Sequence, residues 1–453
     1  MNIETQYPVI APGYGAFITP DGGFIFTYKD INGVKSPQPQ CKGLNVQACA
    51  IIELCTGCNT VKEIVGILDK KFEDTPPDLV SQVTSFLDDI YQEGYIHLSS
   101  APVSIKGLLQ GTTEYHIPYQ VLLETTTGCN LKCGHCLLSA GNPLKDELSA
   151  DQFLPILKRF FDMGVKRVEL SGGEILTKKR WDKLAEFCKN RFISHVLTNG
   201  CLITEETVHT LSWCREIYIS VYGSTAQTHE KVTGVKGSFE QVVTGISLLA
   251  KKGFYVGVSV IVTPFTLHQF EDIVQLAISL QCKIVRVGIV SPLGRAYDKH
   301  WELTLPEKDI LDKKIEELKQ KYTGKIDIQW EEEESEGNQK CGAGVSRWVV
   351  TSNGDVYPCG IFRIPIGNVA REDPLHICVS PAVKFLEKLR PPDKQLCGDC
   401  TYFFACKQCH GQAFIYFLKV NHCGWAEQFE KAPEPFKSAI WEKYNQKKIM
   451  VLR

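Results

Sequence analysis

Apolar and polar residues between positions 119 and 322 follow two periods that alternate along the chain. Short apolar runs, typical of strands, occur at 120–124, 167–171, 195–198, 216–222, 255–262 and 283–288. Stretches with apolar residues three or four positions apart, typical of amphipathic helices, occur at 150–163, 179–190, 204–213, 238–252, 267–280 and 306–322. Ser149 precedes the first of them as a predicted N-cap. Six strand–helix units predict an α/β fold whose parallel strands, joined by right-handed crossovers, curve into a partial (β/α)6 barrel.

A different pattern over residues 1–105 predicts a small separate domain. Two strands, 15–20 and 23–28, flank the turn signal Pro20-Asp-Gly-Gly. Three helices and a closing strand are predicted at 45–54, 60–72, 79–93 and 95–98. Thr60 and Glu63 have the spacing of a capping box at the start of the second helix. This order of elements predicts a winged-helix-like domain.

Residues 106–118 are predicted to be a linker, and residues 323–453 a third domain. Within the third domain, 325–330 is predicted to be a strand and the acidic run 331–336 a solvated loop. Asn353-Gly-Asp is a turn signal between two further short strands. The predicted domains are therefore 1–105, 119–322 and 323–453.

Composition narrows the class of protein. The chain has 453 residues, of which 43% are hydrophobic and 23% charged, a balance typical of a globular protein with two or three domains. A formal net charge of −2 argues against nucleic acid or an anionic membrane as the main partner. Because the N-terminus does not resemble a signal peptide and no apolar run is long enough to span a membrane, we expect a cytoplasmic protein.

Nineteen cysteines are the unusual feature of this composition. In a large intracellular protein, cysteines are more often metal ligands than disulfide partners, and an odd number does not suggest a complete disulfide framework. Three lie between Cys129 and Cys136, and seven that we expect to be ligands lie between Cys341 and Cys423. The others are expected to be small buried hydrophobic residues: Cys41, Cys49, Cys55, Cys58, Cys188, Cys201, Cys214, Cys282 and Cys378.

Cys129, Cys133 and Cys136 come shortly after the first predicted barrel strand. Since a closed zinc site or a fully ligated cubane needs four ligands, three close cysteines suggest a [4Fe–4S] cluster with one open iron. A zinc knuckle and chance clustering are the alternatives. With His135 before the last cysteine, the spacing resembles the signature of radical S-adenosylmethionine (SAM) enzymes. The resemblance implies that SAM binds the open iron and is cleaved to a 5'-deoxyadenosyl radical.

Residues after the next strands fit the same resemblance, because reactive groups of such barrels lie at the carboxyl ends of strands. Gly172, Gly173 and Glu174 form a Gly-Gly-Glu motif that, in this family, binds the methionine amino group. The resemblance also assigns Ser220 and Asn199 to the carboxylate or ribose of SAM, although Asn199 is equally well explained as a turn residue. Arg286 is a candidate to bind the SAM carboxylate or the substrate. Glu124 and Lys132 are expected to be supporting or surface groups.

The C-terminal cysteines have their own spacing. Cys341 and Cys359 are followed by Cys397-x2-Cys400-x5-Cys406-x2-Cys409 and then by Cys423. Zinc ribbons usually separate their cysteine pairs by about 15 to 20 residues, so five intervening residues favour iron–sulfur clusters. The pattern resembles the SPASM extension. This resemblance implies an outer [4Fe–4S] cluster on Cys397, Cys400, Cys406 and Cys423, and an inner one on Cys341, Cys359 and Cys409.

Two residues leave this ligand assignment open. The gap before the last clustered cysteine is more often three residues in this family, and a three-residue gap here would end at His410, which could also ligate a cluster. Cys378 lies between the two cysteine groups and is a candidate eighth ligand, although its apolar neighbours favour a buried thiol.

The N-terminal domain bears on the substrate. Its third predicted helix carries Asp88, Asp89 and Glu93 and no Arg, which disfavours DNA binding. The domain resembles the recognition elements of enzymes that modify ribosomally made peptides, which bind a leader peptide as an added strand beside the hairpin and against the third helix. A packing domain without a ligand is the alternative.

The whole arrangement resembles sactipeptide synthases, especially the thioether-forming maturases of six-cysteine SCIFF-type peptides. The resemblance implies three [4Fe–4S] clusters, SAM, a reductant such as flavodoxin or ferredoxin, and cross-links from cysteine sulfur to an acceptor carbon of a precursor peptide. Other radical modifications of peptides (C–C cross-linking, decarboxylation, epimerisation) use the same modules. An iron–sulfur redox sensor that binds DNA is a rival of a different class.

Overall fold

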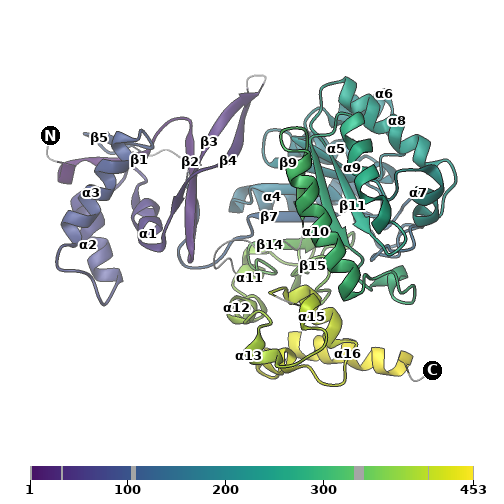
Figure 1. The fold of residues 1–453 in the computed structure, drawn as a ribbon. Coiled ribbons are helices and arrows are strands. Elements are labelled where there is room, and N and C mark those ends of the chain that lie inside the picture. The colour runs from purple at the N-terminus through teal and green to yellow at the C-terminus, as the bar shows by residue number, and fades with distance from the viewer. Residues whose placement is uncertain (1–2, 32–33, 104–108, 331–340, 407, 452–453) are drawn as a thin grey trace. The chain divides into compact units, whose positions relative to one another are not determined.

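The computed structural model describes residues 3–31, 34–103, 109–330, 341–406 and 408–451. They form two compact units (Figure 1). Unit 1 comprises Met1–Tyr119 with Arg159–Lys166 and Asn190–Ile193, and unit 2 comprises the remaining residues. Two short segments of the predicted barrel region thus belong to the same compact unit as the N-terminal domain.

Unit 1 contains a four-stranded sheet in the order β4-β3-β2-β6 and a separate antiparallel pair, β1 with β5. The strands are β1 (Tyr7–Ile10), β2 (Tyr14–Thr19), β3 (Gly22–Ile31), β4 (Val34–Leu44), β5 (Ile96–Ser99) and β6 (Leu109–Gly111). The helices are α1 (Val46–Leu54), α2 (Val61–Lys71) and α3 (Leu79–Gln92), after a 3-10 turn at Ile3–Thr5. The predicted hairpin, three helices and closing strand are confirmed, as is the capping box of Thr60 and Glu63.

Three strands of unit 1 were not predicted. β1 is the partner of the closing strand β5, and β4 contains two prolines and little apolar alternation, which a sheet tolerates at an edge. The prediction that 106–118 is only a linker was wrong, because β6 pairs in parallel with β2. Gly111 ends β6 with a φ of +85°, and a side chain there would meet the Ile18 carbonyl.

The expectation that the scattered cysteines are buried is largely confirmed. Cys49, Cys55, Cys188, Cys282 and Cys378 are buried. Cys201 and Cys214 are only partly buried, and Cys58 is exposed, so the expectation was wrong for Cys58. The side chain of Cys41 lies outside the described residues.

Unit 2 is organised by a ten-stranded sheet in the order β13-β12-β11-β10-β9-β8-β7-β14-β15-β16. Its first seven strands in chain order are β7 (Gln120–Glu124), β8 (Arg167–Ser171), β9 (Ile193–Thr198), β10 (Glu216–Ser220), β11 (Val256–Val262), β12 (Ile284–Ile289) and β13 (Asp327–Trp330). The crossover helices are α4 (Ala150–Met163), α5 (Trp181–Cys188), α6 (Glu205–Leu211), α7 (Ala226–Thr233), α8 (Ser238–Lys251), α9 (Phe270–Ser279) and α10 (Leu305–Lys321) (Figure 1). The parallel pairings among strands β7 to β13 confirm the predicted α/β architecture. Helix α7 was not predicted.

The C-terminal part continues the same sheet. The remaining strands are β14 (Arg347–Val350), β15 (Asp355–Tyr357) and β16 (Gly367–Asn368). The remaining helices are α11 (Pro374–Cys378), α12 (Pro381–Lys388), α13 (Lys394–Cys397), α14 (Phe403–Cys406), α15 (His410–Phe417) and α16 (Phe436–Val451). β14 pairs in parallel with β7, and the predicted hairpin is formed by β14 and β15. The sheet therefore runs across the predicted boundary at residue 322, and the acidic run 331–336 lies outside the described residues.

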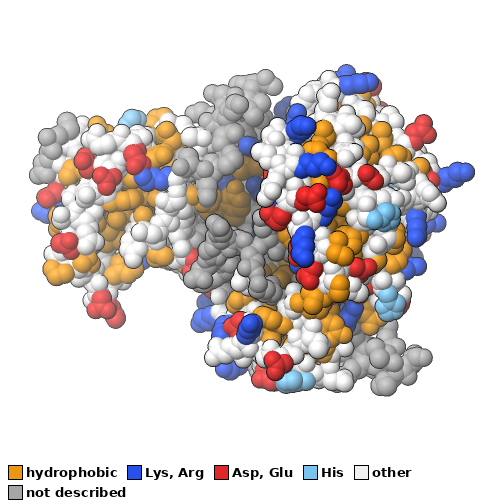
Figure 2. Space-filling view, in the orientation of Figure 1, with side chains coloured by type: hydrophobic (Ala, Val, Ile, Leu, Met, Phe, Trp, Pro, Cys, Tyr) orange, Lys and Arg blue, Asp and Glu red, His pale blue; other side chains and the backbone are white. Residues whose placement is uncertain are grey.

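The surface and the helices add two observations. Figure 2 shows cationic and anionic side chains interspersed over the visible face of unit 2. Of the helices in the described parts of the chain, none is long and apolar enough to cross a membrane.

Candidate cysteine-rich metal centres

The loop that carries the first three cysteines leaves the carboxyl end of β7 and is held there by Glu147. The backbone N–H of Thr127 donates to Glu147 at 2.6 Å, and the hydroxyls of Thr126 and Thr127 each donate to the same carboxylate at 2.8 Å. Burial raises the pKa of Glu147, but these hydrogen bonds together hold it below its ordinary value. An ionised Glu147 thus fixes the backbone just before Cys129.

Helix α7, which sequence reasoning missed, supports the middle of the loop. The N–H groups of Lys132 and Gly134 donate to the last carbonyls of α7, those of Thr233 and Val232, each at 2.9 Å. These carbonyls lack partners within the helix and are therefore available as acceptors. Gly134 is needed because a side chain there would overlap the ring of Trp301.

Arg295 fastens the far end of the loop. Its Nε donates to the carbonyl of Cys133 at 2.8 Å, its Nη1 to that of Ala140 at 2.7 Å, and its backbone N–H to that of Cys136 at 3.0 Å. Gly294, just before it, lies so close that a side chain would meet the carbonyls of Cys136 and Leu137. The position of Arg295 after the end of β12 is the one signal in the sequence that could have identified it.

The three thiols lie close together. Burial raises the pKa of Cys133 to about 12, and the nearby Cys136 and Cys129 add to the rise. His135 is packed edge-on against Tyr222 at 4.5 Å between ring centroids. Burial, and then the Arg295 charge, lower the pKa of His135 to about 4, so its imidazole is neutral. The three partly buried cysteines therefore lie beside a neutral imidazole and the ring of Tyr222.

Gly172, Gly173 and Glu174 pass directly beneath this loop. A side chain at Gly172 would meet the Thr126 backbone and one at Gly173 the Gly128 backbone, so only glycine allows this close approach. The Glu174 carboxylate is fully engaged by the protein: it accepts from the N–H of Leu176 at 3.0 Å, the hydroxyl of Thr198 at 2.7 Å and the N–H of Asn199 at 2.7 Å. Glu174 thus anchors the end of β9, and its predicted contact with SAM stays a prediction.

The other predicted SAM contacts fall into two places. The Asn199 side chain lies 3.9 Å from the sulfur of Cys129 and donates to the side chain of Asn130 at 2.7 Å. Ser220, Ser259 and Arg286 are level across β10, β11 and β12. The guanidinium of Arg286 lies over the Tyr218 ring, 3.6 Å from its centroid. Asn199 therefore lies beside a cysteine of the loop.

A charged group near Arg286 was also missed by sequence reasoning. The buried His195 lies between two carboxylates, 3.5 Å from Glu169 and 3.6 Å from Glu216. The hydroxyl of Tyr218 donates to Glu216 at 2.6 Å. Such residues lie within strands, where periodicity predicts only a strand face.

Cys341, Cys359 and Cys409 form a second group. Burial raises the pKa of Cys359 to about 12, the N–H groups of Ile361 and Phe362 oppose this, and the nearby Cys409 and Cys341 add to it. Cys409 is the N-cap of α15, and its sulfur accepts the N–H of Gln412 at 3.4 Å. The three residues predicted as inner ligands are thus brought together.

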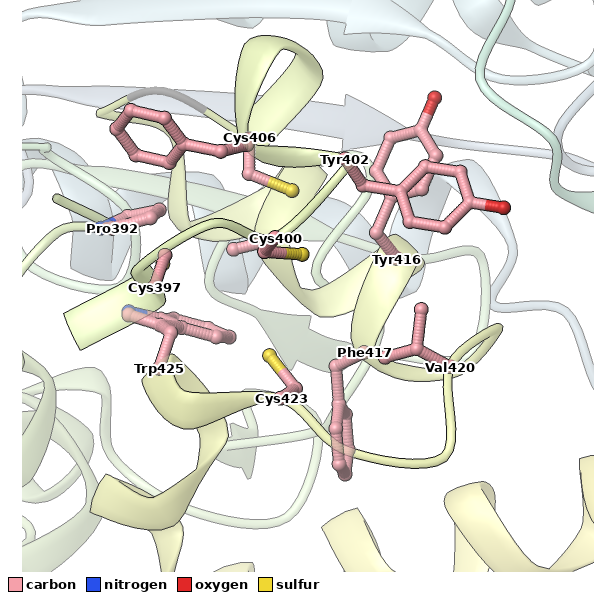
Figure 3. Close-up of a pocket in the computed structure, with 12 residues that line it drawn as sticks. Pro392, Cys397, Cys400, Tyr402, Cys406, Tyr416, Phe417, Val420, Cys423 and Trp425 are labelled. Atoms are coloured by element: carbon pink, nitrogen blue, oxygen red, sulfur yellow. The ribbon is translucent and has the colours of Figure 1, made fainter. Parts of the chain in front are cut away.

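Cys397, Cys400, Cys406 and Cys423 form the third group and line one pocket with Tyr402 and Trp425. Figure 3 shows the sulfurs of Cys400, Cys406 and Cys423 turned toward the same space, with Cys397 beside it. Burial raises the pKa of Cys406, and the nearby Cys423, Cys400, Cys397 and Cys409 add to the rise. The four predicted outer ligands therefore share a pocket.

The surroundings of His410 and Cys378 bear on the ligand assignment. His410 is buried and stacks on Trp425 with ring centroids 5.9 Å apart. Burial raises the pKa of Cys378 to about 12, and its charged neighbours are Asp373 and Glu387 rather than a clustered cysteine. The arrangement favours Cys409 over His410 and gives Cys378 the surroundings of a buried thiol.

The cysteine groups supply ligands of the kind that iron–sulfur clusters use. Four cysteines line one pocket, which is the number that a fully ligated cubane needs. Among the described residues, no group of three His, Cys, Asp or Glu side chains is placed to hold a single metal ion.

Three family models match the chain. The radical SAM superfamily model matches residues 123–277, the SPASM iron–sulfur cluster-binding domain model matches 341–401, and the model of coenzyme PQQ synthesis protein D (PqqD) matches 37–96. The predicted resemblance to all three modules is thereby confirmed.

Known proteins resemble the chain over most of its length. The subtilosin biosynthesis protein AlbA of Bacillus subtilis is 26% identical over 448 residues, covering 95% of this chain and 99% of AlbA. The sporulation killing factor maturation protein SkfB of the same organism is 26% identical over 60% of this chain and 68% of SkfB. The crystal structure of Streptococcus suis SuiB bound to its precursor peptide SuiA has a similar fold, with a TM-score of 0.63, 14% identity and coverage of 91% of this chain and 97% of that one.

The grouping of the cysteines predicts the metal content. Protein purified without oxygen should contain about twelve irons and equal sulfide, as three cubanes require. Replacing Cys129, Cys133 and Cys136 together with Ala should leave about eight irons and abolish SAM cleavage. Metal and sulfide analysis is the measurement. Zinc in place of iron in the triple variant would show that the C-terminal groups were wrongly assigned.

Arg295 should be needed for the first group alone. Arg295→Ala removes two charge-assisted hydrogen bonds to the loop, each worth roughly 1.5 to 3 kcal/mol. We expect iron content to fall toward eight and SAM cleavage to fall about a hundredfold. Arg180→Ala is the matched control, since Arg180 is exposed and its ion pair within the described part of the chain is with the nearby Asp182. Equal iron content in the two variants would contradict the role given to Arg295.

Proposed function

We propose that this chain, a radical SAM enzyme with a SPASM extension and a PqqD-like domain, forms intramolecular thioether cross-links in a ribosomally made precursor peptide. A peptide cysteine sulfur becomes bonded to the carbon of an acceptor residue. One observation carries the proposal: this chain contains three cysteine groups and resembles the subtilosin biosynthesis protein AlbA over nearly its whole length.

The cofactors are SAM and three [4Fe–4S] clusters. Cys129, Cys133 and Cys136 would hold the cluster that binds SAM. When bound, this pair of cofactors supplies one-electron cleavage of SAM and so a means of hydrogen abstraction. A flavodoxin or ferredoxin is the proposed reductant, and the cytoplasm, where precursor peptides are made, is the proposed compartment.

The chain's own residues position these groups. The loop is fixed at three points by Glu147, by the end of α7 and by Arg295. The buried rings of His135 and Tyr222 limit water beside it. Gly172 and Gly173 bring the backbone close enough to offer polar groups to the methionine part of SAM. A site held in this way from several elements is pre-organised rather than assembled on binding.

The number of sulfur donors favours sulfur chemistry over the rival radical reactions. Two closed cubanes need eight protein ligands, and the C-terminal groups bring together four and three cysteines. The surroundings of Cys378 make it a poor candidate for the missing donor. A peptide cysteine would complete the inner group of Cys341, Cys359 and Cys409, and metal coordination deprotonates a thiol.

Unit 1 supplies a place for the precursor. Within the described residues β4 is an edge strand of its sheet, beside β3, and an open edge accepts a peptide as an added strand. The PqqD model matches from the later part of β4 through all three helices. SuiB, whose fold is similar, binds a precursor peptide, and we extend this role to unit 1. The predicted site beside the hairpin is thus refined to β4, since β3 is covered on both sides.

The reaction predicts a defined product. With SAM, reductant and a cysteine-containing precursor from the same genetic neighbourhood, each cross-link should remove two hydrogens from the peptide without releasing sulfur. Mass spectrometry with fragmentation should locate a cysteine and its acceptor residue. Cys→Ser in the core peptide is the control and should abolish the cross-link at that position. A mass loss that persists in a cysteine-free core peptide would favour C–C cross-linking or decarboxylation instead.

Leader recognition should be separable from SAM cleavage. Deleting residues 1–105 would also uncover unit 1 residues of the central region, such as Met163 and Lys166, so truncating the peptide is the cleaner test. A core peptide without its leader should be modified at least tenfold more slowly, while uncoupled SAM cleavage is unchanged. Adding the leader as a separate peptide should inhibit modification of the full precursor. Equal rates for the two substrates would refute leader binding.

A further inference from the structure

Glu124 and Arg363 form a buried ion pair that joins two parts of the chain far apart in sequence. The Nη1 atom of Arg363 donates to Oε2 of Glu124 at 2.8 Å, and Nη2 donates to Oε1. The Glu124 side chain is 9% exposed and the Arg363 side chain 16% exposed. Glu124 was expected to be either a supporting or a surface group, and its burial in this ion pair shows that it is a supporting group.

One end of the pair is fixed in the central sheet. Glu124 is the last residue of β7, in register with Ser171 of β8. The next residues, Thr125 to Gly128, lead directly to Cys129. The Glu124 carboxylate therefore has a set position relative to the loop that carries the first cysteine group.

The other end is fixed beside Cys359. Arg363 uses its third donor, Nε, to bind the carbonyl of Gly360 at 2.8 Å, which closes the turn from Cys359 to Arg363. Within this turn the N–H of Phe362 donates to the Cys359 sulfur at 3.2 Å. The Arg363 guanidinium also lies 5.3 Å from the ring centroid of Tyr357, at the end of β15.

Stability alone is a weak reason for such a pair. Desolvating two charges often costs as much free energy as their attraction returns, so a buried ion pair tends to contribute little net stability. A forked guanidinium on a carboxylate does fix geometry. In metal centres, hydrogen bonds and charges around the ligands orient them and set the reduction potential.

We propose that Arg363, held by Glu124, is a positioning residue that places Cys359 and sets the charge beside the inner cysteine group. This proposal rests on the proposed function in one respect, which is that Cys341, Cys359 and Cys409 are ligands of an iron–sulfur cluster. Far from the pair the two charges cancel. Close to it, the reduction potential of the inner group depends mainly on the nearer charge, which is the positive Arg363. The same contact ties that group to the strand that leads to Cys129.

The test is the reduction potential of the inner cluster, measured by redox titration with electron paramagnetic resonance on the whole protein. Arg363→Gln leaves the negative Glu124 uncompensated and should lower the potential. Glu124→Gln leaves the positive Arg363 and should raise it. Each shift should be about tenfold in the one-electron equilibrium constant, or about 59 mV. Glu124→Gln/Arg363→Gln restores neutrality and should fall between the two single variants.

Controls separate this role from general stabilisation. Glu271→Gln removes a negative charge from an ion pair between α9 and α10 and should leave the potential unchanged. Shifts of the same sign in the two single variants, or no shift in either, would overturn the proposal. If Arg363→Gln lost four irons, recovery of those irons in the double variant would support it, and their absence there would overturn it. The measurement needs no peptide, so it can fail while the thioether proposal stands.

Discussion

The parallel pairing of β14 with β7 is the contact on which the arrangement of the cysteine groups depends. It joins the C-terminal hairpin to the strand that leads to Cys129, so that one sheet carries both the first and the inner cysteine groups. Cys129 follows the carboxyl end of β7, whereas Cys341 precedes β14 and Cys359 follows β15, the antiparallel neighbour of β14, so these two flank the amino end of β14. Backbone hydrogen bonds thus fix a relation between groups more than two hundred residues apart, and the Glu124–Arg363 pair adds a side-chain contact across the same join.

Local signals were sufficient for most elements and for the cysteine groups. The strands β7 to β12 and their long crossover helices follow from apolar periodicity, and the capping box at Thr60 from side-chain spacing. Cysteine spacing predicted three groups that the structure brings together. Most of what sequence reasoning missed depends on distant partners. β6 is held as a strand by β2, and β1 by β5, although the two members of each pair lie far apart along the chain. β4 is the next strand after β3, and its prolines and polar residues hide the strand pattern.

The residues that hold the first cysteine loop were missed for a related reason. Glu147 follows the motif by only eleven residues, yet its role is evident only once the chain turns back on Thr126 and Thr127. Arg295 comes from the segment that follows β12, far from the motif along the chain. Each binds backbone groups of the loop rather than a cysteine side chain, so the chemistry-bearing residue types in the motif give no hint of them. A motif identifies ligands, whereas the surrounding fold determines what keeps them in place.

The buried Glu174 carboxyl holds the Gly-Gly-Glu turn to the end of β9. Burial raises the pKa of its carboxyl, and donors from Asn199, Leu176 and Thr198 oppose the rise. A carboxylate buried with so many donors is acceptable only while all of them stay in place, because losing one leaves a poorly solvated charge. The end of β9, which carries Asn199 to within 3.9 Å of Cys129, is therefore tied to the Gly-Gly-Glu turn. Both carboxylate oxygens already accept hydrogen bonds from the protein, so the polar groups that the turn presents to a ligand are those of its backbone. Gly172 and Gly173 bring that backbone close enough because they have no side chain. The three residues therefore act together: the two glycines allow the close approach, and Glu174 anchors the turn to β9.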